Sequence, residues 1–397
     1  MTAGKAALEA TLAQADIRLD GKRPFDIQVR DPRFYDAVLG RWSLGLGESW
    51  MEGWWACERL DELVCRLLRQ RADERPIGLL AWLRLGLASL RARLFNLQSR
   101  GRAFQVGERH YDIGNDIFEA MLDTRMIYSC AYWEHAADLE QAQRDKLAMI
   151  CSKLELSPGQ HLLDIGCGWG GLAPFAAREY GVRVTGVTVS REQKARAEAR
   201  CQGLPVEVRL CDYRDLQGHF DKVVSVGMFE HVGTKNYPTY FDTVRRVLDP
   251  QGIFLLHTIG ADITTARTDA FIDRYIFPNG KIPSVSEIGR ASEGRFIVED
   301  WHNFGRDYDR TLMEWHQRFE AAWPALAPRY GERFRRMWCY YLLGCAGYFR
   351  ARQGQLWQIV FTPCERTAIY RSKRPVGRVA AAGVVPPLKA VSRTLEP

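Results

Sequence analysis

The 397-residue chain lacks several features that mark other classes of protein. Its ten cysteines are scattered and none forms a CxxC pair, so the sequence contains no zinc-site spacing and we predict no metal. A core of this size needs no disulfide, and we expect free thiols in a reducing cytosol. The first 21 residues contain no apolar stretch of the kind found in signal peptides.

Long apolar runs are also missing. The most apolar segment, 77–90, is interrupted by Arg84 and is too short to span a bilayer. The charge is mildly one-sided, with 55 basic and 48 acidic residues and a net charge of +7. This balance suits an anionic surface such as phospholipid or nucleic acid, but it identifies neither.

Apolar residues make up 46% of the chain, which is enough for a large core, and the length favours two domains. We expect a mainly helical N-terminal docking domain over 1–100 and a catalytic domain over 101–371. The segment 372–397 is rich in Pro, Ala, Val and basic residues without periodicity, and we expect a disordered basic tail there.

The segment 66–102 has the pattern of a basic amphipathic helix. It contains nine basic residues and only two acidic ones. Leucines recur at alternating spacings of three and four on one helix face: Leu80, Leu83, Leu87, Leu90, Leu94 and Leu97. Two interpretations stay open, a core helix with a solvated basic face or a surface whose arginines, among them Arg84, Arg91 and Arg93, meet lipid headgroups.

After Pro158 the chain alternates short apolar strands with helical stretches. Such alternation predicts an α/β fold with a doubly wound, mostly parallel sheet. We place helices at 171–180 and 191–201. The expected strands are 161–167, 182–189, 206–212, 222–227 and 252–259, with later strands at 296–302 and 356–361.

A glycine-rich loop, LLDIGCGWGG, follows the first of these strands at Leu162–Gly171. Glycines at 166, 168 and 170 allow the backbone to approach a ligand closely. An NAD-binding unit would carry GxGxxG and an acidic residue about 20 positions further on, at the end of the second strand. That strand end instead reads TVSREQ from Thr188. The loop therefore favours S-adenosylmethionine over NAD, although both remain open on the loop alone.

Several longer motifs resemble one family. They are SLGLGESWMEGWW, LFNLQS, HYDIGND, YSCAYW, LDIGCGWGG, VSVGMFEHVG, LLHTIG, YIFPNG, EDWHNFGRDYD and LWQIVF. With them the chain resembles the cyclopropane-fatty-acyl-phospholipid synthases, within the cyclopropane and mycolic acid synthases, from about residue 19 to residue 371. The resemblance implies a class I S-adenosylmethionine-dependent methyltransferase with a Rossmann-like sheet and a smaller, helical N-terminal domain.

The resemblance also implies which residues contact S-adenosylmethionine. These are Tyr128, Ser129, Leu162, Leu163, Asp164, Ile165, Gly166, Cys167, Gly168, Trp169, Gly170, Thr188, Val189, Ser190, Arg191, Glu192, Gln193, Asp212, Tyr213 and Arg214. Thr188 and Gln193 would offer neutral polar contacts to the ribose where many methyltransferases use a carboxylate.

The implied reaction adds a methylene group to the cis double bond of a phospholipid acyl chain. The alkene attacks the sulfonium methyl group, and the resulting carbocation closes the ring once a proton leaves the new methyl group. Three requirements follow: water must be excluded, electron-rich groups must stabilise the cation, and a base must reach the methyl protons.

In this family a bound bicarbonate ion is understood to act as that base. The resemblance places its ligands at Cys130, Glu230, His257 and Tyr308, with the Ile259 backbone. From the residues alone, Cys130 would be a small buried hydrophobe, His257 a core histidine and Tyr308 a structural cap. The Glu230 pKa is expected to be raised, because a carboxylate beside an anion must share protons.

Other polar residues near these motifs have weaker cases. Cys345 lies in a motif where a catalytic cysteine has been supposed, but the reaction needs no covalent intermediate and no base is placed to activate the thiol. We expect His110, Asp112 and His231 to belong to the scaffold.

The resemblance implies an unsaturated phospholipid as substrate, peripheral contact with the inner face of the membrane from the cytoplasm, and a homodimer in which two docking domains add avidity. No nucleic-acid partner is expected, because the basic stretch lacks interleaved stacking aromatics. Two alternatives remain. One is a related transferase that leaves a methyl branch or an exocyclic methylene. The other is a non-enzymatic basic protein that binds lipid or nucleic acid.

Overall fold

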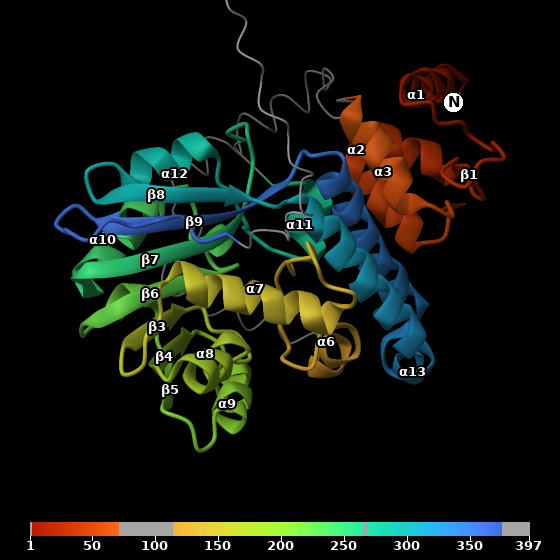
Figure 1. Cartoon of the computed structure of the whole chain (residues 1–397). Coiled ribbons are helices and arrows are strands. Elements are labelled where there is room, and N and C mark those ends of the chain that lie inside the picture. The colour runs from red at the N-terminus through yellow and green to blue at the C-terminus, as the bar shows by residue number, and fades with distance from the viewer. Residues whose placement is uncertain (1, 71–113, 266–267, 375–397) are drawn as a thin grey trace, which may run out of the picture.

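The computed structural model describes residues 2–70, 114–265 and 268–374. The whole leucine stripe at 80–97, its arginines, His110, Asp112 and the tail beyond residue 374 lie outside these ranges. A seven-stranded sheet forms one half of the described molecule, and the N-terminal helices lie at the opposite end (Figure 1).

The sheet has the strand order β5-β4-β3-β6-β7-β9-β8. The first five strands of this order run parallel, while β9 is antiparallel to both β7 and β8. The predicted doubly wound, mostly parallel sheet is therefore confirmed. Its strands are β3 (His161–Ile165), β4 (Arg183–Thr188), β5 (Val206–Leu210), β6 (Phe220–Val226), β7 (Leu248–Gly260), β8 (Phe296–Asn303) and β9 (Gln355–Pro363).

Successive side chains of a strand point to opposite faces of the sheet, and each face has its own helices. Leu162 of β3 belongs to a buried cluster with residues of α7 and α8, whereas Leu163 packs with α10 and α12. The helices of this region are α7 (Leu139–Lys153), α8 (Leu172–Tyr180), α9 (Arg191–Arg200), α10 (Tyr237–Val247), α11 (Ala270–Tyr275) and α12 (Val285–Ser292). Short 3-10 turns follow β5 and β6 at η2 (Tyr213–Asp215), η3 (Phe229–His231) and η4 (Thr234–Asn236).

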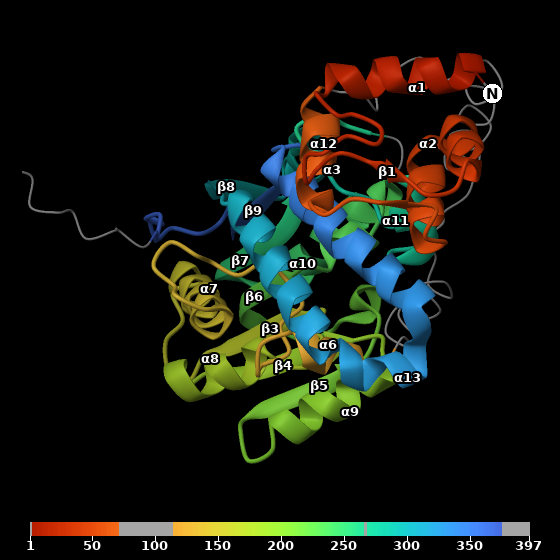
Figure 2. The ribbon, with the colours of Figure 1, turned by 90° about the vertical axis from the view of Figure 1, so that its right-hand side faces the viewer.

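The N-terminal segment packs on α13 (Arg306–Arg350), which consists of two helical arms separated by the non-helical residue Gly331 (φ 74°). The chain reverses there, so the two ends of α13 lie side by side, with the rings of Tyr308 and Phe349 stacked at 4.6 Å. In Figure 2 the two arms of α13 run diagonally between the sheet and the N-terminal elements. One buried apolar cluster joins these elements with residues of α6 (Asn115–Met121) and α13. The N-terminal elements are α1 (Thr2–Gln14), β1 (Gln28–Val29), α2 (Arg33–Met51), β2 (Trp55–Ala56) and α3 (Leu60–Arg69). No helix of the described ranges combines the length and the apolar character needed to cross a bilayer.

Candidate active site

A cavity of about 220 Å³ lies at the carboxyl ends of β3, β4 and β6. The strand order reverses between β3 and β6, and ligands of open α/β sheets bind at such a point. The glycine loop after β3 forms part of the wall, with Gly166 at φ 87°. A Cβ atom at Gly166 would lie 2.7 Å from the Cβ of Met228, so glycine is needed there for conformation and for space.

The structure brings most of the predicted cofactor residues to this cavity. Those that line it are Tyr128, Ser129, Asp164, Ile165, Gly166, Cys167, Gly168, Trp169, Thr188, Val189, Gln193, Asp212, Tyr213 and Arg214. The cavity therefore gathers residues from four separate segments of the chain.

Six predicted cofactor residues do not line the cavity. Leu162 and Leu163 are fully buried in the two faces of the sheet. Gly170 lies behind the loop, where an added Cβ would come within 2.9 Å of Ala197 Cβ. The others begin the helix α9: Ser190 caps it by accepting a hydrogen bond from Gln193 N–H, and the side chains of Arg191 and Glu192 are exposed.

Neutral and paired polar groups line the second-strand side of the cavity. The hydroxyl of Thr188 donates to Gln193 Oε1 at 2.8 Å. Arg214 holds Asp212 with two hydrogen bonds of 2.8 and 2.6 Å, which compensates both charges. These side chains can offer hydroxyl, amide and carboxylate oxygens to a nucleoside.

The cavity also contains residues that sequence reasoning missed. Lys146 of α7 is one, and Met228 and Asn279 are others. His231 lines the cavity too, although we expected it to be scaffold. Burial lowers the pKa of His231 to about 4, so its ring is neutral at physiological pH.

A second group of predicted residues adjoins the cavity. Cys130 is fully buried in an apolar cluster with Phe304 and Leu356, against which Ile259 and Tyr308 pack. The Cys130 Sγ donates to the carbonyl of Ala131, and burial raises the pKa of the thiol well above its usual value. Since Tyr128 and Ser129 line the cavity and Cys130 follows them directly, one segment connects the two groups.

Glu230 lies in the turn η3 directly after β6. Its Oε1 accepts a hydrogen bond of 2.7 Å from the backbone N–H of Ile259, so that N–H is already used within the protein. The other oxygen, Oε2, is buried and has no partner among the described residues. Burial raises the pKa of Glu230 to about 7, as expected for a desolvated carboxyl group.

His257 lies on β7 and is 1% exposed. Its Nδ1 is 3.3 Å from Nε2 of Gln358 on β9, whereas its Nε2 has no partner within the described ranges. Burial, together with the charges of Lys146 and Lys153, lowers the pKa of His257 well below its usual value. With the Gln358 amide donating to Nδ1, the neutral ring carries its hydrogen on Nε2 and can donate it to a ligand.

Tyr308 lies in the first turn of α13 rather than at an isolated bend. Burial raises its pKa well above the usual value, and the proximity of Cys130, Tyr128, Glu230 and Cys345 adds to the effect. The predicted ligands Cys130, Glu230 and Tyr308 are therefore neighbours in space. Aromatic rings surround this place, since Trp315 lies 6.0 Å from Tyr308 and 5.2 Å from Tyr128 between ring centroids.

Cys345 is close to Tyr308 but does not line the cavity. Burial raises the pKa of its thiol to about 12, so the reactive thiolate form is scarce at neutral pH. All ten cysteines are free thiols, as the sequence predicts.

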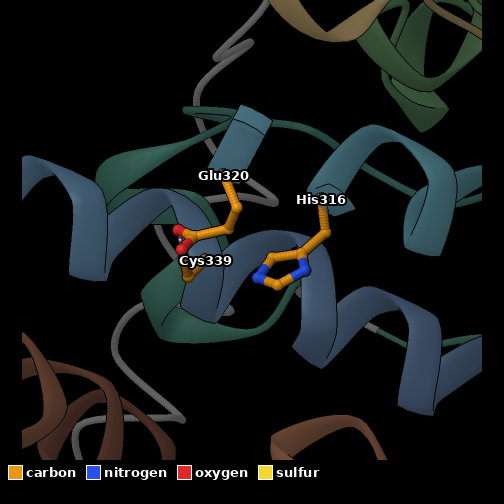
Figure 3. A group of neighbouring side chains, drawn as sticks. All are labelled: His316, Glu320 and Cys339. Carbon is orange, nitrogen blue, oxygen red and sulfur yellow. Dashed lines mark hydrogen bonds between the residues drawn. The ribbon is translucent and has the colours of Figure 1, made fainter. Parts of the chain in front are cut away.

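One group of side chains has the composition of a metal site. His316, Glu320 and Cys339 of α13 have ligand atoms within 4.8 Å of one another (Figure 3). However, Glu320 already accepts hydrogen bonds from the Cys339 thiol at 3.0 Å and from Arg335 Nε at 2.9 Å. Because the Arg335 guanidinium neutralises the carboxylate, the group needs no metal ion to balance its charge.

Comparison with known proteins identifies relatives that cover most of the chain. The model of the mycolic acid cyclopropane synthetase family matches residues 98–359. The cyclopropane-fatty-acyl-phospholipid synthase of Escherichia coli (strain K12) is 56% identical over 352 residues, which cover 88% of this chain and 91% of that protein. A tuberculostearic acid methyltransferase of Mycobacterium tuberculosis is 35% identical over 79% of this chain and 77% of its own length.

Solved structures agree with these relatives. A cyclopropane synthase of Mycobacterium tuberculosis, MmaA2, is 30% identical and superposes with a TM-score of 0.62 over 65% of this chain and 97% of its own. The mycolic acid cyclopropane synthase CmaA1, solved with SAH and CTAB, is 31% identical with the same TM-score and the same coverage.

These matches confirm the predicted class I fold and the predicted enzyme class, an S-adenosylmethionine-dependent methyltransferase. They cover the cofactor cavity and the group of buried residues beside it. The chain belongs to the mycolic acid cyclopropane synthetase family.

Proposed function

We propose that the protein transfers a methylene group from S-adenosylmethionine to the cis double bond of an unsaturated acyl chain in a membrane phospholipid, which forms a cyclopropane ring. One observation carries the ring-closing step: two unpartnered polar atoms, Glu230 Oε2 and His257 Nε2, are buried beside the cofactor cavity. Buried polar atoms are nearly always paired, so an unpaired set indicates a site for a small polar ligand.

The relatives support the substrate class. The E. coli relative, at 56% identity, carries the name cyclopropane-fatty-acyl-phospholipid synthase. The CmaA1 structure holds SAH, the demethylated form of S-adenosylmethionine, in the same fold.

The described residues suit an intermediate that is a carbocation. Cys130, Phe304 and Leu356 make the enclosure apolar, which excludes water that would trap the cation as an alcohol. The ring of Trp315 lies 5.2 Å from that of Tyr128 and 6.0 Å from that of Tyr308 between centroids, and the electron-rich faces of these rings can stabilise a positive charge.

The same enclosure suits a bicarbonate ion, which when bound would supply the base for the methyl proton. Glu230 Oε2 can accept a hydrogen bond, while the Nε2–H of His257 and the hydroxyl of Tyr308 can donate one each. In this arrangement the Ile259 N–H acts through Glu230, because it orients that carboxyl group.

We further propose that the enzyme works at the inner face of the membrane as a peripheral protein and as a homodimer. The acyl chain must be drawn from a bilayer, and the basic segment 66–102, with the N-terminal domain 1–100, is the proposed docking region. Two docking regions per assembly would increase the residence time on the membrane.

The test is to incubate the protein with labelled S-adenosylmethionine and vesicles of an unsaturated phospholipid, and to record NMR spectra of the acyl product. Ring protons are the expected result. A methyl branch or an exocyclic methylene would favour the alternative function, which the 35% identical tuberculostearic acid methyltransferase makes specific. Mass alone does not separate ring closure from methylene addition, since both add CH2.

A further inference from the structure

The cofactor cavity contains two cationic side chains, but only one of them lacks a counter-ion. Arg214 is held by both carboxylate oxygens of Asp212. Lys146 lines the same cavity and forms no ion pair within the described ranges of the chain, although the charges of Asp123 and Asp164 act on it and burial lowers its pKa to about 8. A third basic side chain, His231, is neutral because burial lowers its pKa to about 4.

The position of Lys146 in the cavity wall is fixed by burial and by hydrogen bonds. This lysine is fully buried, and its Nζ donates a hydrogen bond of 2.7 Å to the hydroxyl of Ser129. Gln143, one turn earlier on α7, donates to the carbonyl of Ser129 at 2.9 Å, so the helix fixes this segment at two points. A buried ammonium group without an ion-pair partner is costly, and a bound ligand that carries a negative charge would offset this cost.

An acidic side chain completes the pattern. Asp164 lines the cavity and its charge acts on Lys146, yet the two side chains are too far apart to form an ion pair with each other. Burial raises the pKa of Asp164 to about 7, although Lys146 opposes this shift. The cavity thus offers one cation and one carboxyl group to a ligand that carries both charges.

The methionine part of S-adenosylmethionine has this charge pattern, with a carboxylate and an ammonium group on one carbon. We propose that Lys146, together with the Ser129 hydroxyl, binds the carboxylate of the cofactor, while Asp164 faces its ammonium group. This assignment rests on the proposed function for the identity of the cofactor, but it does not depend on the lipid product.

The test is a comparison of two ligands by isothermal titration calorimetry. S-adenosylhomocysteine carries the amino-acid part, and 5′-methylthioadenosine has the same nucleoside and sulfur without it. For Lys146→Met we expect S-adenosylhomocysteine to bind about 10- to 100-fold more weakly, as for a lost charged hydrogen bond. The affinity for 5′-methylthioadenosine should change by less than about twofold.

Two further variants keep the result interpretable. Lys146→Arg retains the cation and should restore most of the discrimination between the two ligands. Lys153→Met is the matched control, because Lys153 is also a buried lysine of α7 but contacts His302 at 3.0 Å and does not line the cavity. It should leave both affinities unchanged, and bound 5′-methylthioadenosine will report that each variant retains a folded site.

Two outcomes would overturn the inference. If Lys146→Met weakens both ligands equally, or leaves the affinity for S-adenosylhomocysteine unchanged, then Lys146 is only structural. If the wild-type protein does not bind S-adenosylhomocysteine at all, the proposed function fails as well. The behaviour of the wild-type protein therefore distinguishes a failure of the proposed function from a failure of the Lys146 inference alone.

Discussion

Glu230 has two oxygens in different situations. Oε1 is fixed by the Ile259 N–H at 2.7 Å, and Oε2 is buried without a partner in the described part of the chain. The first contact orients the carboxyl group, so the second oxygen is left in a defined position for a ligand. His257 repeats this pattern, since Gln358 occupies one ring nitrogen and the other is unpartnered.

We predict that Glu230→Gln lowers kcat and leaves cofactor affinity intact. A glutamine side chain has only one acceptor oxygen. It therefore cannot use one oxygen for the Ile259 N–H and a second oxygen for a ligand, as Glu230 can. The expected loss in kcat is about 10- to 100-fold, as for one hydrogen bond to a charged group. Glu230 does not line the cofactor cavity, so the Kd of S-adenosylhomocysteine should not change.

Steady-state kinetics with phospholipid vesicles, combined with calorimetry, separate the two quantities. A variant that keeps full kcat would show that Oε2 takes no part in turnover. A parallel loss of S-adenosylhomocysteine binding would instead indicate a disturbed cavity.

At the scale of elements, the two arms of α13 bring the catalytic side of the molecule next to the N-terminal segment, since Tyr308 of its first turn stacks on Phe349 of its last turn at 4.6 Å. The last turns of α13 pack against α3 of the N-terminal segment. This contact depends on Gly347, where an added Cβ would lie 2.4 Å from the carbonyl oxygen of Asp61 and 3.0 Å from the backbone nitrogen of Cys65. Close approach of the two helices is therefore possible only with glycine at this position.

We predict that Gly347→Ala destabilises the protein by about 1–3 kcal/mol, because the extra methyl group meets backbone atoms that cannot rotate away. Gly344→Ala, one turn earlier, is the control, since no atom lies within 4 Å of the added Cβ. Higher helix propensity should make that variant about 0.5–1 kcal/mol more stable. Denaturant unfolding measures both, and equal stability of the two variants would refute the packing argument.

At the scale of the whole molecule, the sequence predicts the sheet well and the cavity in part. Each predicted strand is present, because strands buried on both faces read as short apolar runs between turns. The cofactor loop was recognisable because closely spaced glycines directly after a strand indicate a close approach of the backbone to a ligand. Lys146 was not, because it follows Arg144 and Asp145 in a helix of mixed charge, where a lysine usually faces solvent.

The first arm of α13, which ends at Gly331, was hidden for a similar reason. Pro324 and Pro328 lie inside it, and prolines normally end a helical pattern. The neighbourhood of Cys130, Glu230, His257 and Tyr308 also could not be derived from spacing, since these residues come from four distant segments that only the folded chain brings together.

We propose that a donor cavity and a separate buried oxyanion site work side by side in this enzyme. The most direct test is the rate of product formation against bicarbonate concentration, starting from buffer freed of carbon dioxide. We predict that turnover falls in the depleted buffer and is restored by added bicarbonate, with a weaker response in Glu230→Gln. Full turnover of the wild-type enzyme without bicarbonate would show that no bound bicarbonate takes part in the reaction.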